Sequence, residues 1–113
     1  MKQSYRYIVS LFILIVLAAC GDTVELPRLG DDAVVLSFGD SLTSGTGAKQ
    51  AESYPAILAR LTGRKVVNAG IPGELSEQGL RRLPALLDEH QPDLLILCHG
   101  GNDILRKKDL NQM

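Results

Sequence analysis

The sequence has very few aromatic residues, with no tryptophan, three tyrosines and two phenylalanines among 113 residues. Stacking platforms for nucleic acid bases depend on aromatic side chains, so this scarcity argues against one. An excess of positive charge is missing as well, because 12 Lys and Arg face 13 Asp and Glu and the basic residues are scattered. We therefore expect no nucleic acid partner.

Long apolar runs are missing except near the N-terminus. Residues 7–17 are apolar apart from Ser10, and they follow the basic residues Lys2 and Arg6. This run is shorter than the roughly 20 residues that a membrane-spanning helix needs. It is typical of a secretory signal peptide.

The segment Leu17-Ala18-Ala19-Cys20 resembles the lipobox of bacterial lipoproteins. The resemblance implies cleavage before Cys20 and lipid attachment to this cysteine, whose acyl chains would anchor the protein to a membrane. The alternative is an ordinary signal peptide with a chance cysteine. Because Gly21 follows rather than Asp, we expect a cell-envelope location, at the periplasmic face of the outer membrane in a Gram-negative host.

Cysteine is scarce too, and Cys98 is the only one besides Cys20. If Cys20 carries lipid, an intrachain disulfide is excluded. Cys98 ends a Leu-rich segment, so we expect it to be a small buried hydrophobic residue rather than a nucleophile.

The composition that remains, 45% hydrophobic and 22% charged, is typical of one small folded domain. We divide the chain into a signal peptide (residues 1–19), a lipidated N-terminus with a polar tether (20–32) and a folded portion (33–113).

Hydrophobic patterning predicts two strand–helix units and a third strand, an α/β arrangement. The predicted strands are Ala33–Phe38, Lys65–Ala69 and Asp93–Cys98, and the predicted helices lie near Tyr54–Leu61 and Ser76–Glu89. Crossovers of about 30 residues join parallel strands, almost always with right-handed connections.

Several local features carry further expectations. The segment Leu94–Cys98 reads as a central strand, and Pro84 is expected to kink or divide the second helix. Arg81, Arg82, Asp88 and Glu89 are expected to face solvent.

Ser41 follows the first strand directly, at the rim of the sheet where α/β proteins bind ligands. Gly39 is expected to permit a tight turn before it, and residues 41–52 are expected to form a polar, Gly-rich loop. The residues alone leave two interpretations open, a nucleophilic serine or a serine that merely caps a helix.

The carboxyl ends of parallel strands meet at one edge of a sheet, so Ser41, Gly73 and Asn102 should converge. A serine that attacks an acyl carbon builds negative charge on the carbonyl oxygen. The N–H groups of Ser41 and Gly73 and the Asn102 side-chain amide are donors that could stabilise this charge.

Three blocks in the same order resemble the conserved blocks of the GDSL, or SGNH, hydrolases. They are Gly39-Asp40-Ser41-Leu42, then Asn68-Ala69-Gly70-Ile71-Pro72-Gly73-Glu74-Leu75-Ser76, then Gly100-Gly101-Asn102-Asp103. The spacing looks closest to the bacterial lysophospholipase/thioesterase I-like and arylesterase branch. Residues 33–113 would then be the N-terminal portion of an SGNH hydrolase domain.

The resemblance implies a flavodoxin-like parallel sheet with helices on both faces, and neither a metal nor an organic cofactor. It implies that Ser41 is the nucleophile, with Ser41, Gly73 and Asn102 forming the oxyanion hole. Asp40 and Asp103 are expected to support the site by hydrogen bonds to the backbone. The implied substrates are small acyl esters, aryl esters, thioesters or lysophospholipids.

One family feature is missing, because no Asp-x-x-His motif occurs in the sequence. His90 precedes the third strand and should lie at the opposite edge of the sheet, whereas His99 should lie at the correct edge, more naturally in a structural role than as the base. We expect a chain cut short before that motif and inactive alone.

Two other functions are considered. One is a non-catalytic envelope binding module that retains the pocket. The other is a nucleotide-binding domain, which is disfavoured because the segment 39–44 matches neither a P-loop nor a dinucleotide fingerprint.

Overall fold

The computed structural model describes residues 6, 7, 9 and 27–109. Most of the predicted signal peptide, the predicted lipidation site Cys20 and the first part of the tether therefore lie outside the described residues. Within the described part of the chain, no helix has the length and apolar character that a membrane crossing requires.

Three parallel strands form the sheet, as the sequence predicts. They are β1 (Val34–Gly39), β2 (Lys65–Gly70) and β3 (Leu94–Cys98), in the spatial order β2-β1-β3. Leu36 pairs with Val67 of β2 on one side and with Leu95 of β3 on the other. In the described residues β1 is thus the central strand. In the same residues β3 pairs with β1 alone, so the central position expected for Leu94–Cys98 is not reached in this part of the fold.

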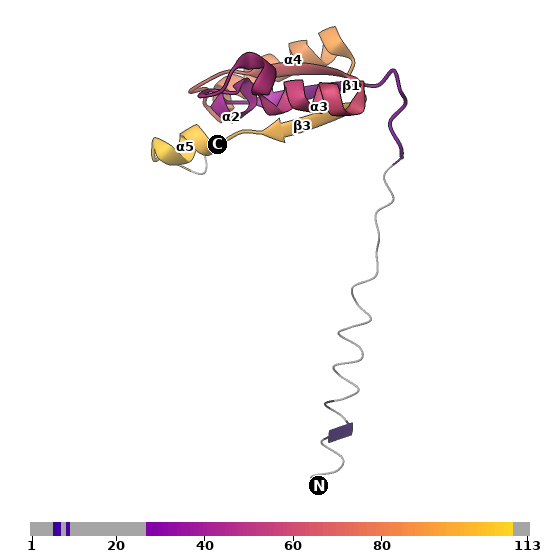
Figure 1. Ribbon diagram of the computed structural model, residues 1–113. Coiled ribbons are helices and arrows are strands. Elements are labelled where there is room, and N and C mark those ends of the chain that lie inside the picture. The colour runs from indigo at the N-terminus through magenta and orange to yellow at the C-terminus, as the bar shows by residue number, and fades with distance from the viewer. Residues whose placement is uncertain (1–5, 8, 10–26, 110–113) are drawn as a thin grey trace.

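The strands are joined by helices that Figure 1 shows around the sheet. The helical segments are α2 (Ser41–Ser44), the 3₁₀ turn η1 (Gln50–Glu52), α3 (Tyr54–Thr62), α4 (Ser76–His90) and α5 (Gly101–Leu105). The first of these corrects the prediction of a loop over 41–52. This segment begins as a helix because Asp40 caps it, its Oδ1 accepting the N–H of Leu42 at 3.1 Å.

The boundaries of the two longer helices follow from local signals. Pro55 lies in the first turn of α3, and Gly63 ends that helix in the left-handed conformation, with φ of 69°. The helix α4 runs unbroken through Pro84, so of the two outcomes expected at this proline, a kink or a division, the division does not occur. A proline removes a single backbone N–H, and the remaining turns hold the helix together.

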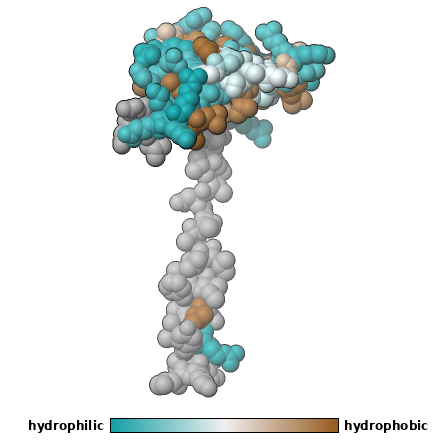
Figure 2. Space-filling model, turned by 90° about the vertical axis from the view of Figure 1, so that its left-hand side faces the viewer, coloured by the Kyte–Doolittle hydropathy of each residue, from teal (hydrophilic) through white to brown (hydrophobic). Residues whose placement is uncertain are grey.

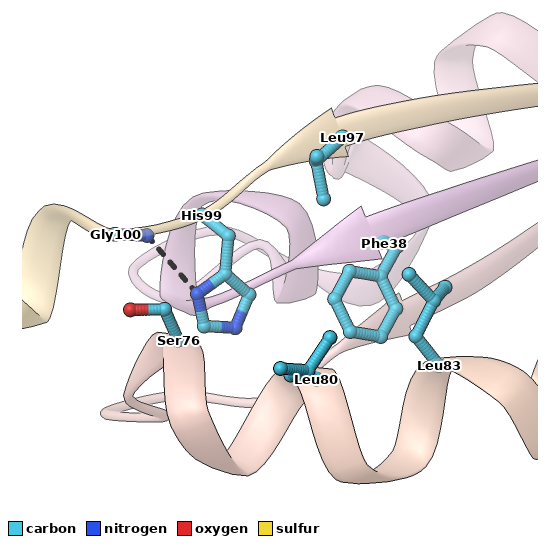
Figure 3. Close-up of a pocket in the computed structure, with 7 residues that line it drawn as sticks. All are labelled: Phe38, Ser76, Leu80, Leu83, Leu97, His99 and Gly100. Carbon is cyan, nitrogen blue, oxygen red and sulfur yellow. Dashed lines mark hydrogen bonds between the residues drawn. The ribbon is translucent and has the colours of Figure 1, made fainter. Parts of the chain in front are cut away.

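Helices cover both faces of the sheet. The Phe38 side chain points towards α4 (Figure 3), whereas a Cβ at the next residue, Gly39, would collide with Thr43 of α2. Since successive residues of a strand point to opposite faces, α4 and α2 lie on opposite faces. The flavodoxin-like arrangement implied by the family resemblance is thereby confirmed for this part of the fold.

The core is centred on β1. Val35, Leu36 and Phe38 are at most 3% exposed, and Ala33 just before the strand is also buried. Burial of such side chains typically stabilises a fold by about 1.5–3 kcal/mol each, so the central strand is the best-anchored element.

Cys98 differs from the prediction, because its side chain is exposed. It is the last residue of β3, an edge strand in the described structure, and Leu97 beside it is 62% exposed. The apolar side chains at the end of β3 are therefore exposed, because no further strand covers this edge in the described structure.

Candidate active site

The loops that follow the three strands meet at the carboxyl edge of the sheet. Ser41 is the first residue of α2, Gly73 lies in the turn after β2, and Asn102 lies in α5 after β3. The Asn102 Nδ2 donates to Asp40 Oδ2 at 3.3 Å and to the Glu74 carbonyl oxygen at 3.1 Å. These two acceptors are the sequence neighbours of Ser41 and Gly73, so the predicted trio shares one edge.

Ser41 is half-buried and does not cap the helix, because Asp40 is the N-cap residue. Asp40 is 6% exposed, and its two carboxylate oxygens accept hydrogen bonds from different donors. Oδ1 accepts the N–H of Leu42, and Oδ2 accepts from Asn102. One carboxylate therefore fixes both the start of α2 and the asparagine amide.

Gly73 takes a conformation that favours glycine, with φ of 76°. Its carbonyl oxygen accepts from Arg106 Nη2 at 3.2 Å. A shallow polar cavity of about 300 Å³ adjoins it. The residues that line this cavity are Ile71, Pro72, Gly73, Glu74, Gln78 and Arg106.

Asp103 connects two helices behind the site. It is 2% exposed, and its Oδ2 accepts the backbone N–H of Ser76 at 2.9 Å. Desolvation is the largest single influence and raises its pKa, but the hydrogen bonds from Ser76 and from the Asp103 backbone together with the nearby His99 outweigh it, so the pKa of Asp103 lies below its ordinary value. The charged carboxylate thus ties α5 to the first turn of α4.

A buried charged cluster that the sequence did not indicate lies beside these loops. It consists of Glu74, Arg82 and His99. Glu74 is 6% exposed, and both of its carboxylate oxygens accept from Arg82 at 2.7 Å. The hydrogen bond from Arg82 is the main reason that the pKa of Glu74 lies below its ordinary value.

The position of Arg82 corrects a prediction. Arg81 is 63% exposed in its side chain, as expected, but the Arg82 side chain is only 22% exposed. It lies 4.2 Å from the centre of the Phe38 ring. Helical spacing could have indicated this, because Arg82 follows the buried Gly79 by three residues and so shares its face.

His99 has both ring nitrogens engaged. Its Nδ1 accepts the N–H of Gly100 at 3.0 Å, and Nε2 lies 3.0 Å from Glu74 Oε2. A nitrogen that accepts from a backbone N–H carries no proton, so the proton lies on Nε2 and is donated to Glu74. This arrangement fits the structural role expected for His99 and leaves no free nitrogen for a base.

His90 lies at the last position of α4, just before β3 begins, and its Nε2 is 3.8 Å from Glu89 Oε1. It is therefore remote from Ser41, as predicted. In the described residues neither histidine is placed to accept a proton from the serine.

An open apolar groove of about 340 Å³ lies between α4 and β3 (Figure 3). Its lining residues are Phe38, Ser76, Leu80, Leu83, Leu97, His99 and Gly100. Leu80 is 70% exposed, so the groove is open to one side. Figure 2 shows apolar side chains gathered along part of the surface of the folded region.

No group of three or more His, Cys, Asp or Glu side chains suited to a metal ion occurs among residues 6, 7, 9 and 27–109. The features that the described residues do bring together are a serine at a helix start, a glycine turn and an asparagine amide. The molecule is accordingly a parallel α/β protein with a serine-bearing site at the carboxyl edge of its sheet.

The chain belongs to the GDSL-like lipase/acylhydrolase family, whose profile matches residues 37–113. The family predicted from the three sequence blocks is thereby confirmed. Proteins of this family include esterases and thioesterases, which act on ester bonds.

Similar proteins agree in both sequence and fold. The thioesterase 1/protease 1/lysophospholipase L1 of Escherichia coli K12 is 47% identical over 74 residues, which are 64% of this chain and 36% of that protein. Esterase TesA of Pseudomonas aeruginosa is 38% identical over 97 residues, 81% of this chain and 48% of that protein.

Among solved structures, the SGNH-hydrolase family esterase AlinE4 is 40% identical, with a TM-score of 0.63. The match covers 73% of this chain and 47% of AlinE4. The chain thus spans less than half of the length of each of these relatives, and its fold is a part of the SGNH-hydrolase fold.

Proposed function

We propose that the protein is a serine ester hydrolase that works through an acyl-Ser41 intermediate. Its substrates would be small acyl or aryl esters, thioesters or lysophospholipids, the classes named for its relatives. The observation that supports this most directly is the position of the Asn102 amide, hydrogen-bonded to the neighbours of both Ser41 and Gly73.

The oxyanion would be stabilised by the N–H groups of Ser41 and Gly73 and by the Asn102 amide. The amide already donates to two acceptors, and the bond to Asp40 is the longer, at 3.3 Å against 3.1 Å. A substrate oxygen would therefore replace Asp40 as acceptor while the bond to Glu74 persists. One such donor typically contributes a factor of about 10²–10³ to the rate.

A general base is the part of the machinery that the described residues do not supply. Because both nitrogens of His99 are occupied and His90 is remote, we expect the chain to hydrolyse esters no faster than background. The same observation favours a second candidate, a binding module that keeps the site without catalysis.

Rescue by an added base distinguishes the two candidates. Hydrolysis of a p-nitrophenyl ester is measured with and without imidazole for the unmodified chain, Ser41→Ala and the matched control Ser44→Ala from the same helix. After subtraction of the protein-free rate at the same imidazole concentration, a hydrolase that lacks a base shows a rate increase with imidazole that Ser41→Ala abolishes and Ser44→Ala retains. Equal rates for all three proteins would support the binding module, and a Ser41-dependent rate without imidazole would refute the expected inactivity.

We also propose that lipid on Cys20 anchors the protein at the periplasmic face of the outer membrane, as the lipobox-like segment suggests. In a Gram-negative host, radiolabelled palmitate should label the protein and its Cys98→Ser variant, and both should fractionate with the outer membrane. Cys20→Ser should lose the label and leave the membrane fraction. Label retained in Cys20→Ser would contradict the anchor.

A further inference from the structure

The buried cluster of Glu74, Arg82 and His99 connects all three strand ends. Arg82 Nη2 donates to the carbonyl oxygen of Ala69 in β2 at 2.7 Å and to that of Gly39 in β1 at 3.4 Å. His99 directly follows β3. Their common partner is the Glu74 carboxylate, which lies in the turn after β2.

This cluster is closely packed. The His99 ring stacks on Phe38, with ring centres 5.5 Å apart, and the same Phe38 ring lies below the Arg82 guanidinium. A Cβ at Gly79 would lie 2.7 Å from His99 Nε2, so only glycine leaves the imidazole its place. Close packing on every side restricts the three side chains to one arrangement.

Glu74 links this cluster to the proposed oxyanion site. Its side chain belongs to the cluster, while its backbone carbonyl accepts one proton of the Asn102 amide. With that proton held, the orientation of the planar amide is restricted and its second proton is directed elsewhere, at present to Asp40. Gly73, whose N–H is another proposed donor, precedes Glu74 directly.

We propose that Glu74, fixed by Arg82 and His99, is a positioning residue that sets the orientation of the Asn102 amide and the Gly73 N–H. The proposal rests on the proposed function, because it assigns these donors to an oxyanion. Its physical basis is that a donor fixed before the reaction needs no reorganisation when charge develops. A buried carboxylate with two charged or polar partners is held in place in this way, because any movement that breaks one of these hydrogen bonds leaves the buried carboxylate without a partner.

The first test reads the donor itself. Nuclear magnetic resonance follows the Asn102 side-chain amide in the unmodified chain, in Glu74→Gln and in the matched control Glu77→Gln, an exposed glutamate of α4. In Glu74→Gln the amide resonances should shift and exchange with water about tenfold faster. Glu77→Gln should match the unmodified chain.

A second pair of variants covers the case in which Glu74→Gln does not fold. Arg82→Lys keeps the charge but loses the two-pronged contact, so Asn102 should shift in the same direction by less. Its control is Arg81→Lys. The backbone amide of Val35 in β1 is the control for a general loosening of the fold. Such loosening would shift its resonance, whereas the proposal expects this resonance to stay unchanged in both variants. If neither variant folds, the unmodified chain is titrated with acid instead. The proposal then requires that the Asn102 side-chain resonances shift as the Glu74 carboxyl takes up its proton.

Folded Glu74→Gln and Arg82→Lys with unaltered Asn102 resonances would overturn the proposal, as would a Glu74 titration that Asn102 does not follow. The imidazole-assisted rate is a separate readout, and Glu74→Gln should lower its kcat about tenfold with KM unchanged. If the unmodified chain shows no Ser41-dependent rate in the presence of imidazole, the proposed function fails, and the resonance data still decide whether Glu74 positions Asn102.

Discussion

At the scale of single residues, two glycines, Gly39 and Gly70, determine how closely α2 approaches the sheet. A Cβ at Gly70 would lie 2.6 Å from the Thr43 carbonyl carbon and 2.7 Å from the Ser44 Cα, both backbone atoms that cannot move aside alone. We expect Gly70→Ala to lower the free energy of unfolding by about 1–3 kcal/mol, the usual cost of overpacking. Urea denaturation measures this change.

The matched control for this substitution is Gly101→Ala. A Cβ at Gly101 meets only Asp40 Oδ2, at 3.5 Å, which is ordinary contact, and the residue lies in a helix where alanine is favoured. Its unfolding free energy should change by less than about 1 kcal/mol. If both variants lose the same amount of stability, close approach of α2 is not the cause.

The positions of the candidate site residues could be predicted from the sequence wherever the path of the backbone determines them. Ser41, Gly73 and Asn102 follow three successive parallel strands, so topology alone brings them to one edge. Arg82 was mispredicted because an arginine beside a second arginine looks solvent-facing. Its burial is compensated by Glu74 and by backbone carbonyl oxygens of β1 and β2, which only the fold brings together. Gly39 was predicted as a turn residue, but its φ is not positive and the collision with Thr43 requires the glycine.

At the scale of elements, apolar runs and helix-ending signals predicted every strand and the two longer helices. The short α2 was missed because four residues carry no hydrophobic period, and its formation depends on the Asp40 cap. The position of β3 in the sheet does not follow from the sequence, since the run Leu94–Cys98 reads the same in a central strand as at an edge. In the described structure its Leu94 and Leu97 are 40% and 62% exposed. Sequence periodicity thus identifies a strand but not how many neighbours it has.

At the scale of the whole molecule, the carboxylates of Glu74 and Asp103 couple folding to pH. Both groups have a pKa below the ordinary values of 4.5 and 3.8. The folded state therefore holds their charged forms more strongly than the unfolded chain does, so their contribution to stability is complete above these ordinary values. It is lost as the pH falls through the lowered pKa values, because the unfolded chain takes up protons first.

We expect the free energy of unfolding, measured by urea denaturation from pH 6 to pH 3, to decrease below about pH 4.5. One proton contributes a slope of at most about 1.4 kcal/mol per pH unit. Glu74→Gln should flatten this decrease, whereas the exposed control Glu77→Gln should retain the slope of the unmodified chain. An identical slope in Glu74→Gln would show that the Arg82 and His99 contacts do not distinguish the charged from the neutral carboxyl.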